Sequence, residues 1–554
     1  MEEKTNRIPR KRKGMEPEQL LKSYTNLNSV LSKLGFSELR DGQDKAVAAV
    51  FGGNDVIVIL PTGKGKSAVY IIPTLTNDWR TIIFSPLVAL MQDQTESLQK
   101  KGLRAAQLSS LQSDKENEMS LADWEQGNID FLLAAPERLR NEKFLEAAQR
   151  VKPDMVTVDE VHTLSQWSDN FRSDYCKISD FIDQVNPRTV LCLTATCPTE
   201  VEEDVRRVIN IPDAEKVVYL PPRKNLKYES YMWSSPWDLQ KFINSINGST
   251  IVYCATVKET HHLYETIGGQ IQGGSLVFNG QMKQSEKASN QSLFMNSHVR
   301  VMFCTNSFGM GIDKENIRAV IHRDIPGSVE NYSQETGRAG RDDKDSRCIL
   351  FYDEKAIRTQ EFFIQNGHPD KDTVVAFYNS VLSKSDKDRF CYASLYNICQ
   401  DAGLNYYCAQ PVTQILYGSK VLDRVKQDKV IKVKLKKDHI DSKYQKYYEN
   451  IERFGIPDDE GYNEIDVELF VDAMGFAKNT VLKHLTNLAE NDYIDYVPPA
   501  KGNPLKVIGG IKNVDFERLK EKEQEAHGKL NDIVKFFNTP DSEKQNFLVN
   551  YFTS

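Results

Sequence analysis

The sequence lacks a long apolar run, a cysteine pair and an excess of basic residues. No stretch of about 18 apolar residues occurs, which argues against a transmembrane helix. The charged start MEEKTNRIPRKRKG is not followed by an apolar segment, so we expect no secretory signal. The nine cysteines stand singly without a CxxC pair, which argues against a disulfide framework and a zinc finger. We therefore expect an intracellular protein with no membrane partner.

The charge balance limits how the chain could bind a polyanion. Its formal net charge is −7, so binding to nucleic acid would have to use local basic surfaces. The basic run Arg10-Lys11-Arg12-Lys13 leaves three interpretations open, namely a solvated tail, a phosphate-binding arm and a nuclear address. The protein is expected in the nucleus if the cell is eukaryotic and in the cytoplasm otherwise.

The composition is that of a globular protein with several domains. Hydrophobic residues make up 40% and charged residues 27%, which is ordinary globular usage. The 554 residues suit three or four domains of about 100–200 residues each. Residues 1–24 are predicted to form a charged N-terminal tail ahead of the first domain.

Short β-branched runs alternate with helical stretches in two successive series. The first series is VIVIL at 56–60, TIIF at 81–84, FLLAA at 131–135, MVTVD at 155–159 and VLCLT at 190–194. The second is TIVYC at 250–254, SLVF at 275–278, VRVMFC at 299–304, AVIH at 319–322 and CILFY at 348–352. This alternation predicts parallel sheets covered by helices. We predict two tandem α/β lobes, 25–220 and 221–355, with the linker at Pro221-Pro222-Arg223-Lys224.

The pattern after residue 355 becomes helical and irregular. Residues 356–462 are predicted to be a helical region with one basic strand, IKVKLKK at 431–437. Residues 463–511 resemble a winged helix-turn-helix, although a helical pair with a hairpin would give the same pattern. In that module Lys483 and Lys501 are the candidate phosphate contacts, unless the module binds protein or is purely structural. Helices are expected over 512–554.

A phosphate-binding loop follows the first strand run. Strand VIVIL, the loop and the apolar helix that starts at Ala68 come in the order such a site needs. Glycines let backbone N–H groups surround phosphate oxygens, Lys66 reaches the β- and γ-phosphates, and Ser67 ligates Mg²⁺. The predicted ATP-binding residues are Pro61, Thr62, Gly63, Lys64, Gly65, Lys66 and Ser67.

Two carboxylates and two arginines supply the remaining hydrolytic groups. Asp159 and Glu160 follow the strand MVTV, where Asp159 can hold Mg²⁺ and Glu160 can orient and deprotonate a water molecule. The segment QETGRAGRD at 334–342 offers Arg341 as the arginine finger and Arg338 as a second γ-phosphate contact. Gln334 of the same segment is a further catalytic candidate.

Over about residues 25–355 these motifs resemble those of the RecQ family of superfamily 2 helicases. The loop has the shorter PTGxGKS wording of that superfamily, since Leu60 stands where the longer pattern has glycine. GFSELRDGQ at 35–43 is similar to the family's motif 0, which implies that Phe36 and Arg40 sandwich adenine while Gln43 hydrogen-bonds its edge. The resemblance implies RecA-like lobes.

Further matches imply contacts to DNA. They are SPLVALMQDQ at 85–94, APERL at 135–139, the aromatic-rich stretch SQWSDNFRSDY at 165–175, TAT at 194–196, RKNL at 223–226 and SFGMGIDK at 307–314, the last of which is similar to the family's motif V. An aromatic loop beside the hydrolytic carboxylates can stack on a base and report occupancy to Glu160. The implied DNA-contacting or coupling residues are Ser85, Pro86, Arg138, His162, Gln166, Trp167, Phe171, Arg172, Thr194, Thr196, Thr305, Ser307, Gly309 and Asp313.

The sequence departs from the family in three places. The box reads DEVH instead of DEAH, and Arg341-Asp342-Asp343 replaces the usual RDG. Family members commonly carry a four-cysteine zinc module, but Cys391, Cys399 and Cys408 show no ligand-like pairing, so we predict no zinc. Residues 512–554 resemble the helices of that module, with Glu543 at the first cysteine's place. Either packing alone stabilises these helices, or a CxxC segment lies beyond this chain.

The sequence thus predicts an ATP- and Mg²⁺-dependent DNA helicase that moves 3′→5′ on single strands. Its expected partners are single-stranded DNA and duplex or branched DNA, in repair or recombination, with the protein as a monomer. An ATP-switched annealing or remodelling factor and an RNA helicase are the alternatives. A catalytically dead scaffold is disfavoured because Lys66, Asp159, Glu160, Arg338 and Arg341 are all present.

Overall fold

The computed structural model describes residues 17–553, apart from 62–64, 87, 111, 164–168, 196–198, 310–313, 388, 425–429, 437–443, 458–460, 477, 492 and 498–503. The chain divides into two compact units, Met1–Gln365 with Lys522–Ser554, and Asn366–Glu521. The first unit contains both predicted lobes. Within the described residues, no helix combines the length and apolarity needed to cross a membrane.

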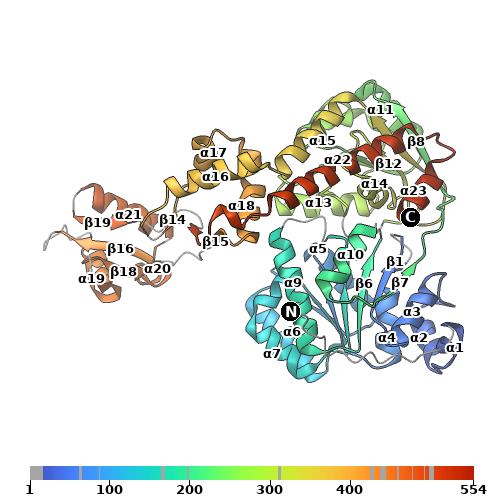
Figure 1. Cartoon of the computed structure of the whole chain (residues 1–554), viewed down its shortest axis with the longest axis horizontal. Coiled ribbons are helices and arrows are strands. Elements are labelled where there is room, and N and C mark those ends of the chain that lie inside the picture. Colours follow the sequence, from blue (N-terminus) through green and yellow to red (C-terminus); the bar gives the residue numbers. More distant parts are fainter. Residues whose placement is uncertain are drawn as a thin grey trace. The chain divides into compact units, whose positions relative to one another are not determined.

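Lobe 1 is a parallel sheet with strand order β3-β4-β2-β5-β6-β1-β7. Figure 1 labels its strands β1, β6 and β7. Its strands are β1 Val56–Ile59, β2 Thr81–Phe84, β3 Ala105–Leu108, β4 Phe131–Ala134, β5 Met155–Val158, β6 Thr189–Thr194 and β7 Glu215–Val218. Its helices are α1 Pro17–Lys22, α2 Leu27–Lys33, α3 Gln43–Phe51, α4 Ala68–Thr76, α5 Val88–Lys100, α6 Asp114–Gln126, α7 Glu142–Val151, α9 Asp169–Val185 and α10 Thr199–Ile209, with the 3-10 turn η1 Pro136–Arg140.

The β-branched runs become central strands because both faces of this sheet are covered. In β1, Ile57 and Ile59 join one apolar cluster with β5 and α9, whereas Val56 and Val58 join another with α3 and α4. A strand buried on both faces cannot alternate apolar and polar residues, which is why VIVIL is continuous.

Lobe 2 is a second parallel sheet with order β10-β11-β9-β12-β13-β8. Its strands are β8 Leu226–Met232, β9 Ser249–Tyr253, β10 Ser275–Phe278, β11 Val301–Cys304, β12 Ile317–His322 and β13 Ser346–Tyr352. Its helices are α11 Pro236–Ser245, α12 Val257–Ile267, α13 Gln284–Met295, α14 Val329–Thr336 and α15 Glu354–Gly367. The series of β-branched runs did not include β8, because this edge strand is only partly buried and carries polar residues.

A C-terminal helical hairpin completes the core of lobe 2. It consists of α22 Phe516–Asn538 and α23 Lys544–Thr553. Apolar side chains of both helices, among them Phe536 and Leu548, share a buried cluster with Tyr228 and Tyr332 of lobe 2. Phe536 lies 4.9 Å from Tyr332, measured between ring centroids. Residues Lys522–Ser554, most of the expected 512–554 helices, therefore belong to the first unit.

The second unit contains two small modules among its described residues. The first has helices α16 Lys371–Ser383, α17 Leu395–Asp401 and α18 Ala409–Gly418, and an antiparallel sheet of order β14-β20-β15, made of Phe390–Cys391, Leu505–Val507 and Leu422–Arg424. The second has helices α19 Gln445–Phe454, α20 Val467–Met474 and α21 Lys478–Glu490, and a sheet of order β17-β18-β16-β19, made of Ile456–Pro457, Asn463–Asp466, Val430–Leu435 and Ile494–Val497.

These modules have different boundaries from the predicted 463–511 winged helix. The basic strand β16 belongs to the same sheet as β18 and β19, while β20, which lies inside 463–511, pairs with β14 and β15 instead. The second module is thus inserted between β15 and β20 of the first. The lysines of the predicted strand 431–437 do not form a purely basic face, because Lys436, directly after β16, forms an ion pair with Asp495 at 2.7 Å.

The observed architecture confirms the predicted fold class of two parallel-sheet lobes followed by a mostly helical C-terminal region.

Candidate active site

A cavity of about 350 Å³ gathers predicted nucleotide-site residues from both lobes. Lobe 1 contributes Phe36, the residues before α4 and the residues after β5, and lobe 2 contributes the end of α14 and the segment after it. The predicted residues that line the cavity are Phe36, Gly65, Lys66, Ser67, Asp159, Glu160, Gln334, Arg338 and Arg341. Phe36 and Arg341, 305 positions apart, therefore face one space. The volume of this space matches that of a small-molecule site.

The described part of the phosphate loop is held by Gln43. Its side-chain amide donates to the carbonyl oxygen of Gly65 at 3.1 Å and accepts from the backbone N–H of Arg40 at 3.0 Å. Gly65 has φ +76°, and a Cβ there would lie 2.5 Å from the Gln43 amide nitrogen. Only glycine fits both the backbone conformation and the close approach. Thr62, Gly63 and Lys64 lie outside the described residues, and Pro61 is half-buried at the end of β1.

Lys66 and Glu160 contact each other across the cavity. The Lys66 ammonium lies 3.4 Å from a Glu160 carboxylate oxygen, and both side chains are mostly buried. Burial alone would raise the pKa of Glu160, but Lys66, His162 and Arg338 outweigh burial and lower it. Glu160 is therefore ionised, which is the state that a general base requires.

The preceding residue, Asp159, is held in place by two hydrogen bonds. One carboxylate oxygen accepts from the Gln94 amide at 2.7 Å, and the other accepts from the Glu160 backbone N–H at 2.9 Å. Burial and the neighbouring Glu160 carboxylate raise the pKa of Asp159. Glu160 itself has φ +48°, in a left-handed region that residues other than glycine seldom adopt. Backbone strain of this kind is common at functional sites.

His162 connects the carboxylates to β6. Its Nδ1 lies 2.9 Å from the hydroxyl of Thr194 and 3.4 Å from the Glu160 carboxylate. Burial is the main cause that lowers the pKa of His162, although Glu160 and Glu330 act in the opposite direction. The imidazole is therefore neutral at physiological pH; its Nδ1 forms its hydrogen bond with Thr194, and the Glu160 carboxylate is a neighbour at 3.4 Å.

The two arginines of lobe 2 lie differently. Both line the cavity, but Arg338 also donates a hydrogen bond to the carbonyl oxygen of Gly309 and is 5% exposed. Gly309 has φ +151°, and a Cβ there would come within 2.7 Å of the Arg338 guanidinium. Arg338 thus joins the ATP side to the segment that resembles motif V.

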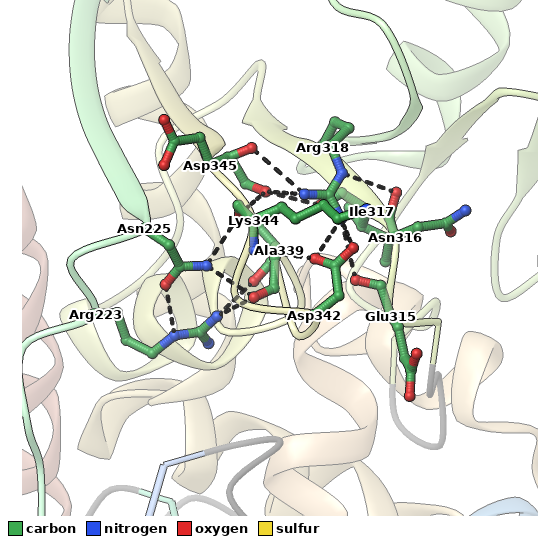
Figure 2. Close-up of polar contacts among 12 residues, drawn as sticks. Arg223, Asn225, Glu315, Asn316, Ile317, Arg318, Ala339, Asp342, Lys344 and Asp345 are labelled. Atoms are coloured by element: carbon green, nitrogen blue, oxygen red, sulfur yellow. Dashed lines mark hydrogen bonds and ion pairs between the residues drawn. The ribbon is translucent and has the colours of Figure 1, made fainter.

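A polar framework surrounds the loop that carries these arginines (Figure 2). Arg223 and Asn225 donate to its backbone carbonyl oxygens, and Arg318 donates to both carboxylate oxygens of Asp342 at 2.6 Å each. The loop has no regular secondary structure at residues 337–345, so side chains fix its course.

The residues predicted to contact DNA are only partly described. Ser85 and Pro86 are buried after β2, Arg138 donates to the carbonyl oxygen of Ser109 at 2.6 Å, and Thr305 lies 2.8 Å from Ser307 between hydroxyl oxygens. Outside the described residues lie Gln166, Trp167, Thr196 and Asp313. Phe171 and Arg172 are on α9, with side chains outside the description. Contact to nucleic acid stays a prediction for this whole set.

Of the three residues predicted to contact adenine, one lines the cavity. Phe36 lines the cavity, whereas Arg40 is exposed and Gln43 holds the phosphate loop; neither is among the described lining residues. The site prediction omitted Gln94, although a signal existed. Gln94 lies on the stripe of α5 that carries the buried Met91 and Leu98, and a polar residue on a buried stripe needs a partner.

The cavity contains two oxygen-bearing side chains of the kind that Mg²⁺ binds. Mg²⁺ bound with a nucleotide needs only one or two protein oxygens, which Asp159 and Ser67 can supply. Among the described side chains, no three His, Cys, Asp or Glu residues lie close enough to hold a metal by themselves. Cys391, Cys399 and Cys408 are buried in the core of the second unit instead.

Two family models match the chain. The DEAD/DEAH box helicase model matches residues 40–205, and the helicase conserved C-terminal domain model matches residues 236–343. The first range contains the Lys66, Asp159 and Glu160 side of the cavity, and the second contains the arginine side.

Curated relatives and solved structures are similar to this chain. An ATP-dependent DNA helicase RecQ of Bacillus subtilis (strain 168) is 35% identical over 346 residues, 61% of this chain and 58% of that protein. A probable ATP-dependent DNA helicase RecS of the same strain is 32% identical over 336 residues, 60% of this chain and 67% of that protein. The structure of Mycobacterium smegmatis helicase Lhr bound to ssDNA and AMP-PNP has a TM-score of 0.51 and 18% identity, covering 75% of this chain and 60% of that one. The last likeness shows the fold alone.

Proposed function

The chain belongs to the RecQ family of superfamily 2 helicases, and on this premise we propose that it is an ATP-dependent DNA helicase moving 3′→5′ on single strands. The chain spans a little over half the length of the first RecQ relatives, 58%, 54% and 52%. The activity of the whole protein is therefore our proposal. The observation that carries it is the cavity in which Lys66, Asp159 and Glu160 face Arg338 and Arg341.

The geometry suggests how hydrolysis would proceed. Phosphate oxygens would attract the Lys66 ammonium and weaken its 3.4 Å contact with Glu160. Glu160 could then orient the attacking water and take its proton while the β–γ phosphate bond breaks. Mg²⁺ held by Asp159 and Ser67 would neutralise charge on the phosphates. Arg341 and Arg338 would stabilise the charge of the transferring phosphoryl group from lobe 2.

Coupling to DNA would depend on lobe movement. Arg338 contacts both the cavity and the carbonyl oxygen of Gly309, so the ATP site and the motif V segment share one side chain. A closure that moves one lobe against the other would therefore move both together. We propose single-stranded and duplex or branched DNA as substrates, with ATP and Mg²⁺ as cofactors and a monomer as the active form.

Strand displacement tests this function. Two duplexes that differ only in a 3′ or a 5′ single-stranded DNA tail are incubated with ATP and Mg²⁺, next to a 3′-tailed RNA duplex. Displacement of the 3′-tailed DNA alone supports the proposal. A preference for RNA would replace the substrate, and DNA-stimulated hydrolysis without displacement would favour the annealing or remodelling factor. The absence of any nucleic-acid-stimulated hydrolysis would refute the proposed function altogether.

A further inference from the structure

The loop 337–345 and two other segments of lobe 2 contact one another (Figure 2). The first is the start of the lobe, with Arg223 in the linker and Asn225 directly after it. The second is Glu315–Arg318, which directly follows the segment resembling motif V. The third is the loop itself, which contains Arg338 and Arg341. A backbone hydrogen bond joins the Gly340 N–H to the carbonyl oxygen of Ile317 at 2.9 Å, and the side chains that join the segments belong to residues that the predicted ATP site did not include.

Arg223 and Asn225 hold the backbone of the loop. Arg223 donates to the carbonyl oxygens of Ala339 at 2.9 Å and Gly340 at 2.7 Å. The Asn225 amide donates to the carbonyl oxygens of Gly340 at 2.8 Å and Lys344 at 3.1 Å. Gly340 has φ +56°, and a Cβ there would lie 2.5 Å from the Asn225 amide nitrogen. The loop is therefore shaped to fit these two side chains.

Arg318 connects the loop to the motif V side. Its guanidinium donates to both oxygens of the Asp342 carboxylate, and it also reaches the carbonyl oxygens of Glu315 and Asn316 at 3.4 Å. The Arg318 and Asp342 side chains are only 15% and 19% exposed, so water screens the pair weakly. A charge-assisted contact in such surroundings is both strong and directional.

The position of Asp342 gives this contact a consequence for the ATP site. Asp342 directly follows Arg341, which lines the cavity. A shift of residues 315–316 would pull on Arg318, and Arg318 would pull on the residue next to the arginine finger. Arg223 and Asn225 hold the other side of the same loop, so the loop has little freedom to absorb the shift locally.

We propose that Arg318 is a positioning residue that, through Asp342, transmits occupancy of the nucleic-acid side to Arg341, while Arg223 and Asn225 anchor the loop. Arg318 touches neither substrate. It sets how much nucleic acid accelerates hydrolysis, and this inference rests on the proposed function.

The test compares two arginines of lobe 2. Arg318→Met removes the contact with Asp342, and Arg318→Lys keeps the charge but loses the planar guanidinium. Arg347→Met is the matched control, because Arg347 also donates to both oxygens of one carboxylate, that of Glu229, at 2.7 Å each. The contacts of Arg347 with Glu229 join β13 to β8 and do not involve the loop 337–345. The measurements are ATP hydrolysis with and without single-stranded DNA, and the thermal unfolding midpoint.

We expect Arg318→Met to lower the DNA-stimulated kcat by about tenfold, the usual size of a coupling change, with KM for ATP and the unstimulated rate within about twofold of the parent. Arg318→Lys should have a DNA-stimulated kcat between that of Arg318→Met and that of the parent. Asp342→Asn should act like Arg318→Met, and the double variant should be no worse than either single one, because both remove the same contact. Arg347→Met should lower the unfolding midpoint but leave the stimulation ratio at the parent's value.

Hydrogen exchange gives a second readout that does not depend on activity. Amides of residues 337–345 should exchange faster in Arg318→Lys than in the parent, and at the parent's rate in Arg347→Met. The inference is overturned if Arg318→Met and Arg318→Lys keep the parent's stimulation ratio, or if the control loses it equally. A parent without stimulated hydrolysis would instead refute the proposed function, so the two failures are distinguishable.

Discussion

At the residue scale, Asp343 occupies a position for which glycine is better suited. Its φ is +57°, in the left-handed region, and the family's RDG wording has glycine there. Aspartate tolerates this region better than most residues, whereas a β-branched residue does not. We expect Asp343→Val to cost about 1–2 kcal/mol of stability and Asp343→Gly to cost less. Thermal unfolding of the three proteins checks this, and equal losses in both variants would show that the side chain, not the backbone, matters.

The Lys66 side chain provides the most direct test of the ATP site. Lys66→Ala removes the phosphate-binding ammonium, so ATP hydrolysis should be abolished while binding to single-stranded DNA is largely kept. Hydrolysis assays and fluorescence anisotropy with labelled DNA measure the two properties. Glu160→Gln is the companion variant, because it removes the base but leaves Lys66 available to the phosphates. Continued turnover in Lys66→Ala would contradict the assignment of the site.

Single residues were predictable where a local motif defines them. Lys66 and Glu160 stand in motifs whose letters alone indicate their chemistry, and the structure places both at one cavity. Gln94 and Asp342 were not predicted as site residues. Their roles depend on partners 65 and 24 positions away, Asp159 and Arg318, which no local pattern identifies.

At the element scale, the hairpin α22–α23 depends on a buried lysine. Lys544 is 1% exposed and donates to the carbonyl oxygens of Phe536 at 3.1 Å, Phe537 at 3.0 Å and Thr539. Lys544→Met keeps the apolar stem but removes three hydrogen bonds, and only the Phe536 carbonyl keeps another donor, the Thr539 N–H at 3.2 Å. The loss should cost about 2 kcal/mol or more. Thermal unfolding measures the loss.

Asp541→Asn is the control for this lysine. Asp541 forms the ion pair with Lys544 at 3.4 Å, but its side chain is 51% exposed. Exposed partners contribute little, so this variant should lose at most about 0.5 kcal/mol.

Loss of stability on adding a chelator to the parent would point to a structural metal and against the prediction of no zinc.

Elements were predictable where burial determines the pattern. The β-branched runs marked the central strands because helices cover both faces of each sheet. Edge strand β8 escaped this pattern because its residues are polar and partly exposed. The sheet of β16, β18 and β19 was also missed, since β16 precedes its partner strands by about 30 to 60 positions and only the tertiary fold brings them together.

At the scale of the whole molecule, the two-lobe organisation was predictable and the second unit was not. Two series of strand runs define two lobes, and their motifs stand at strand ends, where parallel sheets bind ligands. The insertion of one small module between β15 and β20 of another depends on which strands pair in the folded chain. Hydrophobic periodicity carries no information about such nesting.

Acid stability is a property of the molecule to which the Glu229–Arg347 contact contributes. Burial raises the pKa of Glu229, but hydrogen bonds from Arg347 and Tyr231 outweigh burial and lower it below the ordinary 4.5. A carboxyl whose pKa is lowered on folding stabilises the protein above its unfolded pKa, and that stabilisation is lost as the pH falls through the folded pKa. In Arg347→Met the same carboxyl is left partly buried without its arginine, so its folded pKa should rise instead.

The unfolding midpoints of the parent and Arg347→Met should therefore converge at acid pH. We expect the unfolding midpoint of Arg347→Met to lie furthest below that of the parent at pH 7 and the gap to narrow as the pH falls below about 4.5, the ordinary carboxyl value. Lys143→Met, which breaks an exposed ion pair with Glu118, serves as the control and should show little difference at any pH. A gap for Arg347→Met that stays constant from neutral to acid pH would mean that lost packing against Phe242, and not the charge of Glu229, accounts for the loss of stability.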